Sequence, residues 1–212
     1  MRIRHTAIAL ALVALAAAPA LAQAPGREIT KISGDLYRFR NNGHYSVFLV
    51  TPGGVIATDP IDKDAATWLK GEIATRFKQP VKYLIYSHGH GDHASGGEVF
   101  ADTATFVGHD VTKTMMTADR VPGPAPRETF TDTKTVTLGG ASVELTYLGP
   151  NHADGMIVMR FPKERTLFAV DIIPIDSLAY RDFPNANING WIASLKKVEA
   201  MDFDTLAPGH GP

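Results

Sequence analysis

Three histidines and one aspartate lie within six residues of each other, in the pattern H-x-H-x-D-H from His88 to His93. This run directly follows the largely apolar stretch Val81–Tyr86, which predicts a buried strand. Imidazole and carboxylate groups are the ligands that zinc, iron and manganese take from proteins. Histidines two residues apart, on a strand or on the loop leaving it, can reach one ion together. We therefore expect His88 and His90 to share a metal, with Asp92 and His93 placed for a second ion.

Three further residues of ligand type follow predicted strands. His152 comes after Tyr147-Leu148-Gly149-Pro150-Asn151, Asp171 ends the apolar run Phe168-Ala169-Val170, and His210 lies between two glycines. Taken alone, each of the three is typical of a loop, turn or capping residue. Their occurrence together with the first run favours a single site built from several loops.

Composition excludes several classes of site. The 212 residues include no cysteine, so disulfides, thiolate metal ligands and a cysteine nucleophile are excluded. Any bound metal must be held by histidine, aspartate or glutamate. The formal net charge is −1 and no long basic or acidic run is present. The sequence therefore predicts no nucleic-acid partner and no membrane-surface binding.

The N-terminal residues are typical of a secretion signal rather than of a fold. Arg2 and Arg4 precede the apolar run Ala7–Ala18, and Ala20-Leu21-Ala22 has the small-x-small pattern of a cleavage site. The run is short for a membrane span, although an uncleaved anchor is the alternative. We expect a signal peptide over residues 1–22, one domain over residues 23–212, and a periplasmic or secreted protein with no membrane contact after cleavage.

The remaining sequence alternates strands and helices twice. A helix capped by Asp64 is predicted over Ala65–Phe77, and a second helix, capped by Asn189, over Gly190–Met201. A short helix is expected through Gly96–Ala101. Gly139-Gly140 predicts a hairpin turn. The predicted strands are Leu36–Arg40, Tyr45–Val50, Val55–Thr58, Val81–Tyr86, Thr105–Val107, Lys134–Leu138, Ser142–Leu148, Gly155–Phe161, Thr166–Val170 and Thr205–Ala207. This order favours an α/β fold, a four-layer αββα sandwich of two mixed sheets.

At these residues the sequence resembles the metallo-β-lactamase-fold metallohydrolase superfamily. The resemblance covers nearly all of the chain after residue 22 and includes Asp59 at the end of an early strand. It implies that His88, His90 and His152 hold a first metal ion, while Asp92, His93 and His210 hold a second and Asp171 joins the two. It also implies that Asp59 orients a ligand imidazole through a hydrogen bond. Because the family generally continues beyond the position of His210, the fold is expected to lack its last helix.

The resemblance implies a hydrolase that uses two divalent ions, zinc or else iron or manganese, on a small-molecule substrate. A metal-bound hydroxide would attack an ester, lactone, amide or phosphoester, with Asp92 orienting it or accepting its proton. Three alternatives stay open: a β-lactamase, a non-hydrolytic iron redox protein of the same fold, and a metal-dependent binding or scaffold protein without catalysis. The β-lactamase alternative is disfavoured because Ile172-Ile173-Pro174 follows Asp171, where those enzymes usually place a positive or hydroxyl-bearing residue.

His44, His109 and two loops lie outside the predicted ligand set. We interpret His44 as a turn residue, with a place at the pocket edge as the alternative, and His109 as a capping or structural residue. The loops Thr117–Arg127 and Ile175–Asn187 are expected to shape the pocket. Apolar contacts to substrate or to the core are expected from Met115, Met116, Tyr180 and Phe183. The sequence does not indicate the oligomeric state.

Overall fold

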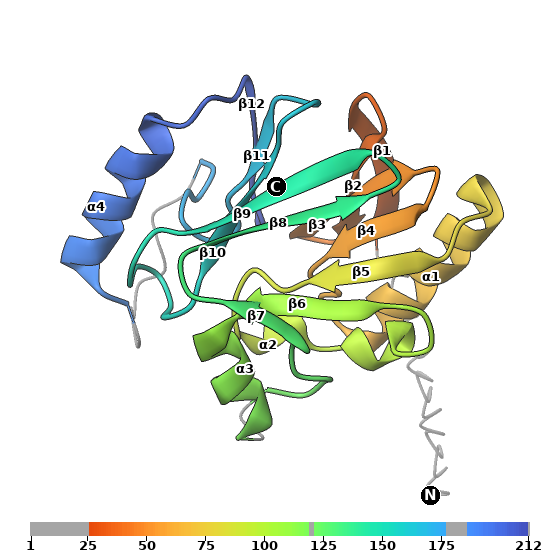
Figure 1. Cartoon of the computed structure of the whole chain (residues 1–212), viewed down its shortest axis with the longest axis horizontal. Coiled ribbons are helices and arrows are strands. Elements are labelled where there is room, and N and C mark those ends of the chain that lie inside the picture. Colours follow the sequence, from red (N-terminus) through yellow and green to blue (C-terminus); the bar gives the residue numbers. More distant parts are fainter. Residues whose placement is uncertain (1–25, 119–120, 177–185, 212) are drawn as a thin grey trace, which may run out of the picture.

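The computed structural model describes residues 26–118, 121–176 and 186–211. Two β-sheets face each other, with helices α1, α2 and α3 against the first and α4 against the second (Figure 1). The predicted four-layer αββα sandwich is therefore confirmed. The predicted signal peptide, residues 1–22, lies outside the described residues.

The first sheet has seven strands in the order of the chain, β1 to β7. Strands β1 to β4 are joined by antiparallel pairing, and β4 to β7 by parallel pairing, so the sheet is mixed. β1 and β7 were not among the predicted strands, and β7, with three residues, is too short to give a periodic signal. The strands are β1 (Arg27–Ser33), β2 (Leu36–Asn41), β3 (His44–Thr51), β4 (Gly54–Thr58), β5 (Val81–Ile85), β6 (Thr105–His109) and β7 (Glu128–Phe130).

The second sheet has five strands in the order β12-β11-β10-β9-β8. Only the β11–β12 pair is parallel, because α4 connects these two strands. The predicted turn at Gly139-Gly140 is confirmed: both glycines have positive φ, 56° and 83°, as a tight two-residue hairpin requires. The strands are β8 (Thr133–Leu138), β9 (Ala141–Tyr147), β10 (Ile157–Phe161), β11 (Thr166–Phe168) and β12 (Thr205–Ala207).

Both long helices begin earlier than predicted, because different residues cap them. Asp62, not Asp64, caps α1 by accepting a hydrogen bond from the Ala65 amide at 2.7 Å. Asn187, not Asn189, caps α4 by accepting from the Gly190 amide at 2.7 Å. The helical segments are α1 (Lys63–Phe77), α2 (Gly91–Ala94), the 3₁₀ turn η1 (Gly97–Phe100), α3 (Asp110–Thr117) and α4 (Ile188–Glu199).

Three separate apolar clusters lie between the four layers. The first packs α1 against the first sheet and includes Phe48 and Leu69. The second fills the space between the sheets and includes Ile85 and Phe168. The third packs α4 against the second sheet and includes Trp191. Because burial on this scale fixes the strand ends in place, the loops that leave them start from rigid positions. None of the described helices is long and apolar enough to cross a membrane.

Candidate metal centre

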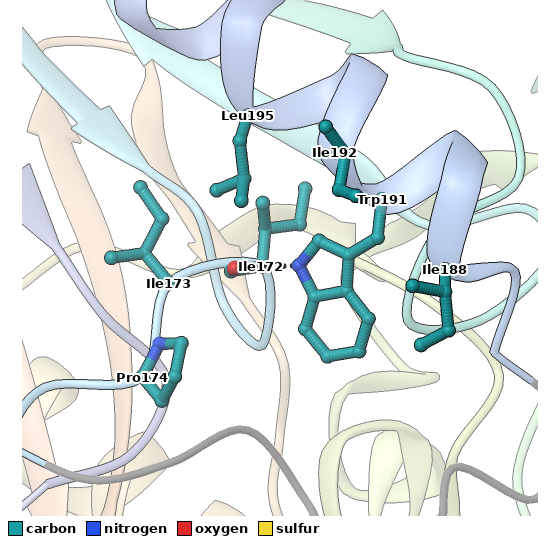
Figure 2. Close-up of a pocket in the computed structure, with 7 residues that line it drawn as sticks. All are labelled: Ile172, Ile173, Pro174, Ile188, Trp191, Ile192 and Leu195. Carbon is teal, nitrogen blue, oxygen red and sulfur yellow. Dashed lines mark hydrogen bonds between the residues drawn. The ribbon is translucent and has the colours of Figure 1, made fainter.

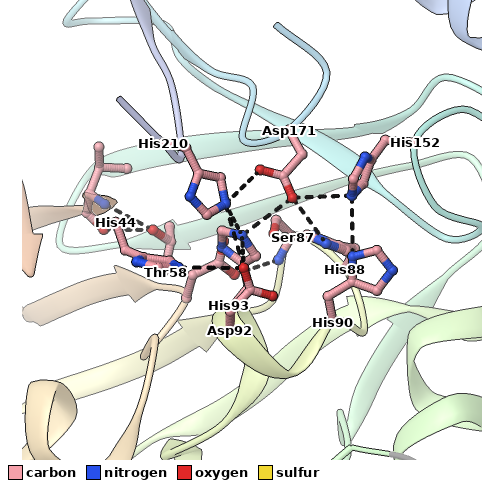
Figure 3. Close-up of polar contacts among 12 residues, drawn as sticks. His44, Thr58, Ser87, His88, His90, Asp92, His93, His152, Asp171 and His210 are labelled. Carbon is pink, nitrogen blue, oxygen red and sulfur yellow. Dashed lines mark hydrogen bonds and ion pairs between the residues drawn. The ribbon is translucent and has the colours of Figure 1, made fainter. Parts of the chain in front are cut away.

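All seven predicted ligand residues meet at one edge of the sandwich (Figure 3). The first sheet contributes the run from His88 to His93, which leaves β5. The second sheet contributes His152 between β9 and β10, Asp171 after β11, and His210 after β12. The run is not entirely loop, because Asp92 and His93 lie on the single helical turn α2.

A first group of donors comprises His88, His90, His152 and Asp171. His152 Nε2 lies 3.2 Å from His90 Nδ1 and 3.3 Å from the Asp171 carboxylate. His88 Nε2 lies 3.4 Å from the same carboxylate oxygen. One ligand atom from each of the four residues lies within 4.8 Å of the others, so a single ion could contact all of them.

A second group comprises His93, His210 and the same Asp171. The Nε2 atoms of His93 and His210 are 2.9 Å apart. His93 Nε2 is 3.3 Å from Asp171 Oδ2, and His210 Nε2 is 3.0 Å from Asp171 Oδ1. Asp171 is thus common to two groups and presents each of its oxygens to the second.

A third group was not predicted: His44, Asp92 and His210. His44 Nε2 is 3.5 Å from Asp92 Oδ2, and its ring centroid is 4.6 Å from that of His210. His44 is therefore not a turn residue but lies at the edge of the site, which was the alternative interpretation. It starts β3, and the backbone there pairs with the segment of His210. Such pairing between distant segments leaves no signal in the sequence around His44.

Buried polar groups lie behind the ligand histidines and contact their rings. Asp59 is completely buried; its Oδ1 accepts a hydrogen bond from the Ser87 amide at 2.7 Å, and its Oδ2 lies 3.5 Å from His93 Nδ1. The Ser87 hydroxyl lies 2.9 Å from His88 Nδ1. Ser87 was missed by the sequence analysis, although a hydroxyl beside a ligand histidine is a signal for this role. His109, as predicted, caps a helix: its Nδ1 accepts from the Val111 amide.

The donor atoms are placed to bind a cation rather than to hydrogen-bond with one another. His88 Nε2 is buried and has no hydrogen-bond partner among the described residues, and the same is true of Asp171 Oδ1. Unpaired polar atoms are costly inside a protein. The imidazole nitrogens that approach each other at 2.9–3.2 Å can hydrogen-bond only if one ring of each pair carries its proton on that nitrogen, whereas a metal ion would take the lone pairs of both. A divalent ion would satisfy these atoms, so the residues present fit the metal that the site implies.

Burial and charge set the protonation of the first group. Burial lowers the pKa of His88 well below its ordinary value, and the neighbouring His93 lowers it further. Burial likewise lowers the pKa values of His90 and His152. Burial alone would raise the pKa of Asp171, but contacts with His210 and His93 outweigh it and hold that pKa far below the ordinary range. Neutral imidazoles and an ionised carboxylate are the states that bind metals.

His93 behaves differently in the metal-free protein. Burial lowers its pKa, but contacts with Asp171 and Asp59 outweigh burial and raise the pKa to about 10. The ring is therefore protonated at neutral pH and must lose that proton when it binds an ion.

An apolar groove lies beside the centre (Figure 2). Its walls are the segment directly after Asp171 and one face of α4, and its volume is about 420 Å³. Trp191 connects it to the site: its ring lies edge-on to His152, with centroids 5.4 Å apart, and its Nε1 donates a hydrogen bond to the Ile172 carbonyl. None of the lining residues is charged: Ile172, Ile173, Pro174, Ile188, Trp191, Ile192 and Leu195.

The remaining residues predicted to line the pocket lie in the core, against the metal loop or outside the described residues. Met116 is buried in the core against the first sheet. Met115 lies against Gly89 in the metal loop, where a Cβ on that glycine would meet its sulfur at 3.2 Å. Tyr180, Phe183 and most of the loop Ile175–Asn187 lie outside the described residues, as do residues 119–120 of the loop Thr117–Arg127.

A sandwich of two mixed sheets with a histidine and aspartate cluster at the strand ends defines a candidate metal-binding protein. The model of the metallo-beta-lactamase superfamily matches residues 73–210, and the chain belongs to that superfamily of metal-dependent hydrolases. A metallo-beta-lactamase from Pontibacter korlensis has a similar structure, with a TM-score of 0.77 and 23% identity. That match covers 88% of this chain and 92% of the other.

Two curated relatives extend the comparison. The chain is 31% identical over 162 residues to the 2,4-dinitroanisole O-demethylase subunit alpha of Nocardioides sp. (strain JS1661), covering 74% of this chain and 49% of that one. It is 27% identical over 173 residues to a metallo-beta-lactamase type 2 of Bacteroides fragilis, covering 80% and 66%. The chain therefore spans about half the length of the first relative and just under two thirds of the second.

Proposed function

We propose that the protein is a hydrolase with a two-ion centre that acts on an ester, lactone, amide or phosphoester. The observation that carries the proposal is the position of Asp171 between two groups of imidazoles. In the proposed centre, His88, His90 and His152 hold the first ion, while Asp92, His93 and His210 hold the second and Asp171 joins them. A shared carboxylate offsets the repulsion between two cations.

The ions, zinc or else iron or manganese, would supply a nucleophile from water near neutral pH and polarise the substrate's carbonyl or phosphoryl oxygen. Asp92 is the candidate for orienting the nucleophile or accepting its proton. Its side chain is about half exposed, at 49%, and its Oδ2 lies within 3.6 Å of both His93 and His210. Asp59 and Ser87 hold the rings of His93 and His88 from behind.

The groove of Figure 2 favours a substrate that is uncharged and apolar on the side of Asp171. An apolar wall gains free energy by covering apolar surface, whereas a carboxylate placed there would lose its hydration without finding a cation. This supports a neutral ester or lactone over a β-lactam antibiotic. A β-lactamase is the second candidate function, favoured by the similarity to the Bacteroides fragilis enzyme. Iron redox chemistry is the third, because the ligand set also suits iron.

One experiment separates these functions. Protein purified without chelators should contain close to two equivalents of metal, measured by elemental analysis. It should hydrolyse neutral apolar esters or lactones in a panel that includes β-lactams and phosphodiesters, and it should lose activity on chelation. His88→Ala should abolish turnover, whereas His109→Gln should not, because His109 lies outside the three donor groups. Preferred turnover of β-lactams, or iron with no hydrolysis, would overturn the proposal.

We also propose export to the periplasm or exterior, with cleavage after Ala22. This rests on the N-terminal sequence pattern. Mass spectrometry of the mature protein would test it, and an N-terminus other than Gln23 would contradict the cleavage site.

A further inference from the structure

His44 is attached to the segment of His210 through the backbone. It forms an isolated β-bridge with His210, the Tyr45 amide donates to the Gly209 carbonyl at 2.8 Å, and the Gly211 amide donates to the Gly43 carbonyl at 3.3 Å. The hairpin between β2 and β3 therefore holds the last residue of the candidate centre in place. Any substitution at position 44 keeps these backbone bonds available, so the role of its side chain can be tested separately.

The side chain of His44 faces the same carboxylate oxygen as two proposed ligands. Asp92 Oδ2 is 3.5 Å from His44 Nε2, 3.5 Å from His93 Nε2 and 3.6 Å from His210 Nε2. In Figure 3 the rings of His44 and His210 lie on the same side of the centre. Two neighbouring ligands bound to one zinc ion lie about 3.0–3.6 Å apart, given a bond length of about 2.1 Å. The spacing of these donors falls within that range.

A simple ion pair accounts less well for this arrangement. At 3.5 Å the His44–Asp92 contact is at the outer limit for a hydrogen bond. His44 is also placed with its ring edge-on to His210 and 6.2 Å from the ring of His93, which brings three imidazoles around one carboxylate. A single cation placed among them could accept a lone pair from each ring.

We infer that His44 is a further donor to the second metal ion, the one held with Asp92 and His210. This inference rests on the proposed two-ion centre. It gives that ion an imidazole supplied by β3, an element that carries none of the other proposed ligands.

Metal-free protein titrated with Co²⁺ tests the inference, because the visible absorption of Co²⁺ reports its ligands. Two variants are matched: His44→Phe keeps a ring against His210 but offers no nitrogen donor, and His44→Ala removes both. We expect both variants to bind the first ion with unchanged affinity. Both should bind the second about tenfold to a hundredfold more weakly, with an altered absorption spectrum for that ion.

Three results would overturn the inference. Wild-type affinity for the second ion in both variants would remove the donor role. Loss in His44→Ala with retention in His44→Phe would show that the ring only packs against His210. Equal loss of both ions in His44→Phe would show that His44 does not serve one ion. If the wild-type protein itself binds fewer than two ions, the two-ion centre fails instead, so the two failures are distinguishable.

Discussion

Asp59 Oδ2 and His93 Nδ1 lie 3.5 Å apart, and both side chains are completely buried. The other oxygen of Asp59 accepts the Ser87 amide, at the start of the metal loop. Asp59 therefore connects the end of β4 to both ends of the H-x-H-x-D-H run. Because its charge attracts the ring N–H at Nδ1, it leaves Nε2 of His93 facing the centre as the ligand atom.

Asp59→Asn should weaken the binding of the second ion more than the binding of the first. An amide can still accept from Ser87, but it lacks the charge that holds His93 in this tautomer. We expect the dissociation constant of the second ion to rise about tenfold to a hundredfold, measured by zinc calorimetry. Asp62→Asn is the matched control, since asparagine caps α1 about as well as aspartate. Equal effects of the two substitutions on zinc binding would contradict a specific role for Asp59.

Gly209→Ala should displace His210. A Cβ on Gly209 would lie 2.2 Å from Val170 Cγ1, which forces the segment away from the sheet. We expect a loss of affinity for the second ion of at least about tenfold, and destabilisation by about 1–3 kcal/mol in urea unfolding from the overpacking. Gly211→Ala is the control, because its Cβ would meet Tyr45 at an ordinary 3.5 Å. If Gly211→Ala is the more damaging of the two, the packing argument is wrong.

The sequence predicted the layers and the seven ligand-type residues better than it predicted their neighbours. Strong local patterns predict the buried strands and the run from His88 to His93. The other three ligand-type residues were recognised only through their occurrence together with that run and the family resemblance: His152, Asp171 and His210. The position of His44 depends on a β-bridge between residues 166 positions apart, which no local pattern encodes. The predictions of the helix caps were wrong for a different reason. Asp62 and Asp64 are both suitable cap residues, and only the backbone, extended at Asp62, selects the first.

The two ions should respond differently to pH. A proton competes with the metal only below the pKa of the ligand. Because the pKa values of His88, His90 and His152 are all lowered, protons compete for the first site only at a more acidic pH than for ordinary histidines. The pKa of His93, about 10 in the metal-free protein, makes competition at the second site significant already at pH 7.

Lowering the pH from 8 to 6 should therefore reduce the affinity for the second ion about tenfold per pH unit, while the affinity for the first ion stays nearly unchanged. Zinc titrations against a competing chelator at three pH values measure this directly. Parallel loss of both ions as the pH falls would contradict the assignment of His93 to a separate site.

Ile192→Ser should weaken the binding of apolar substrates without changing the metals. Ile192 lines the groove and is 50% exposed, so a substrate arm can cover the remaining surface. Covering half of an isoleucine side chain is worth about 1 kcal/mol, which predicts about a fivefold rise in KM with kcat unchanged. Ala193→Ser introduces the same hydroxyl at an exposed neighbouring position of α4 that does not line the groove, and it should leave KM unchanged. If Ile192→Ser leaves KM unchanged for every apolar substrate, or if both variants raise it equally, the groove does not hold the substrate.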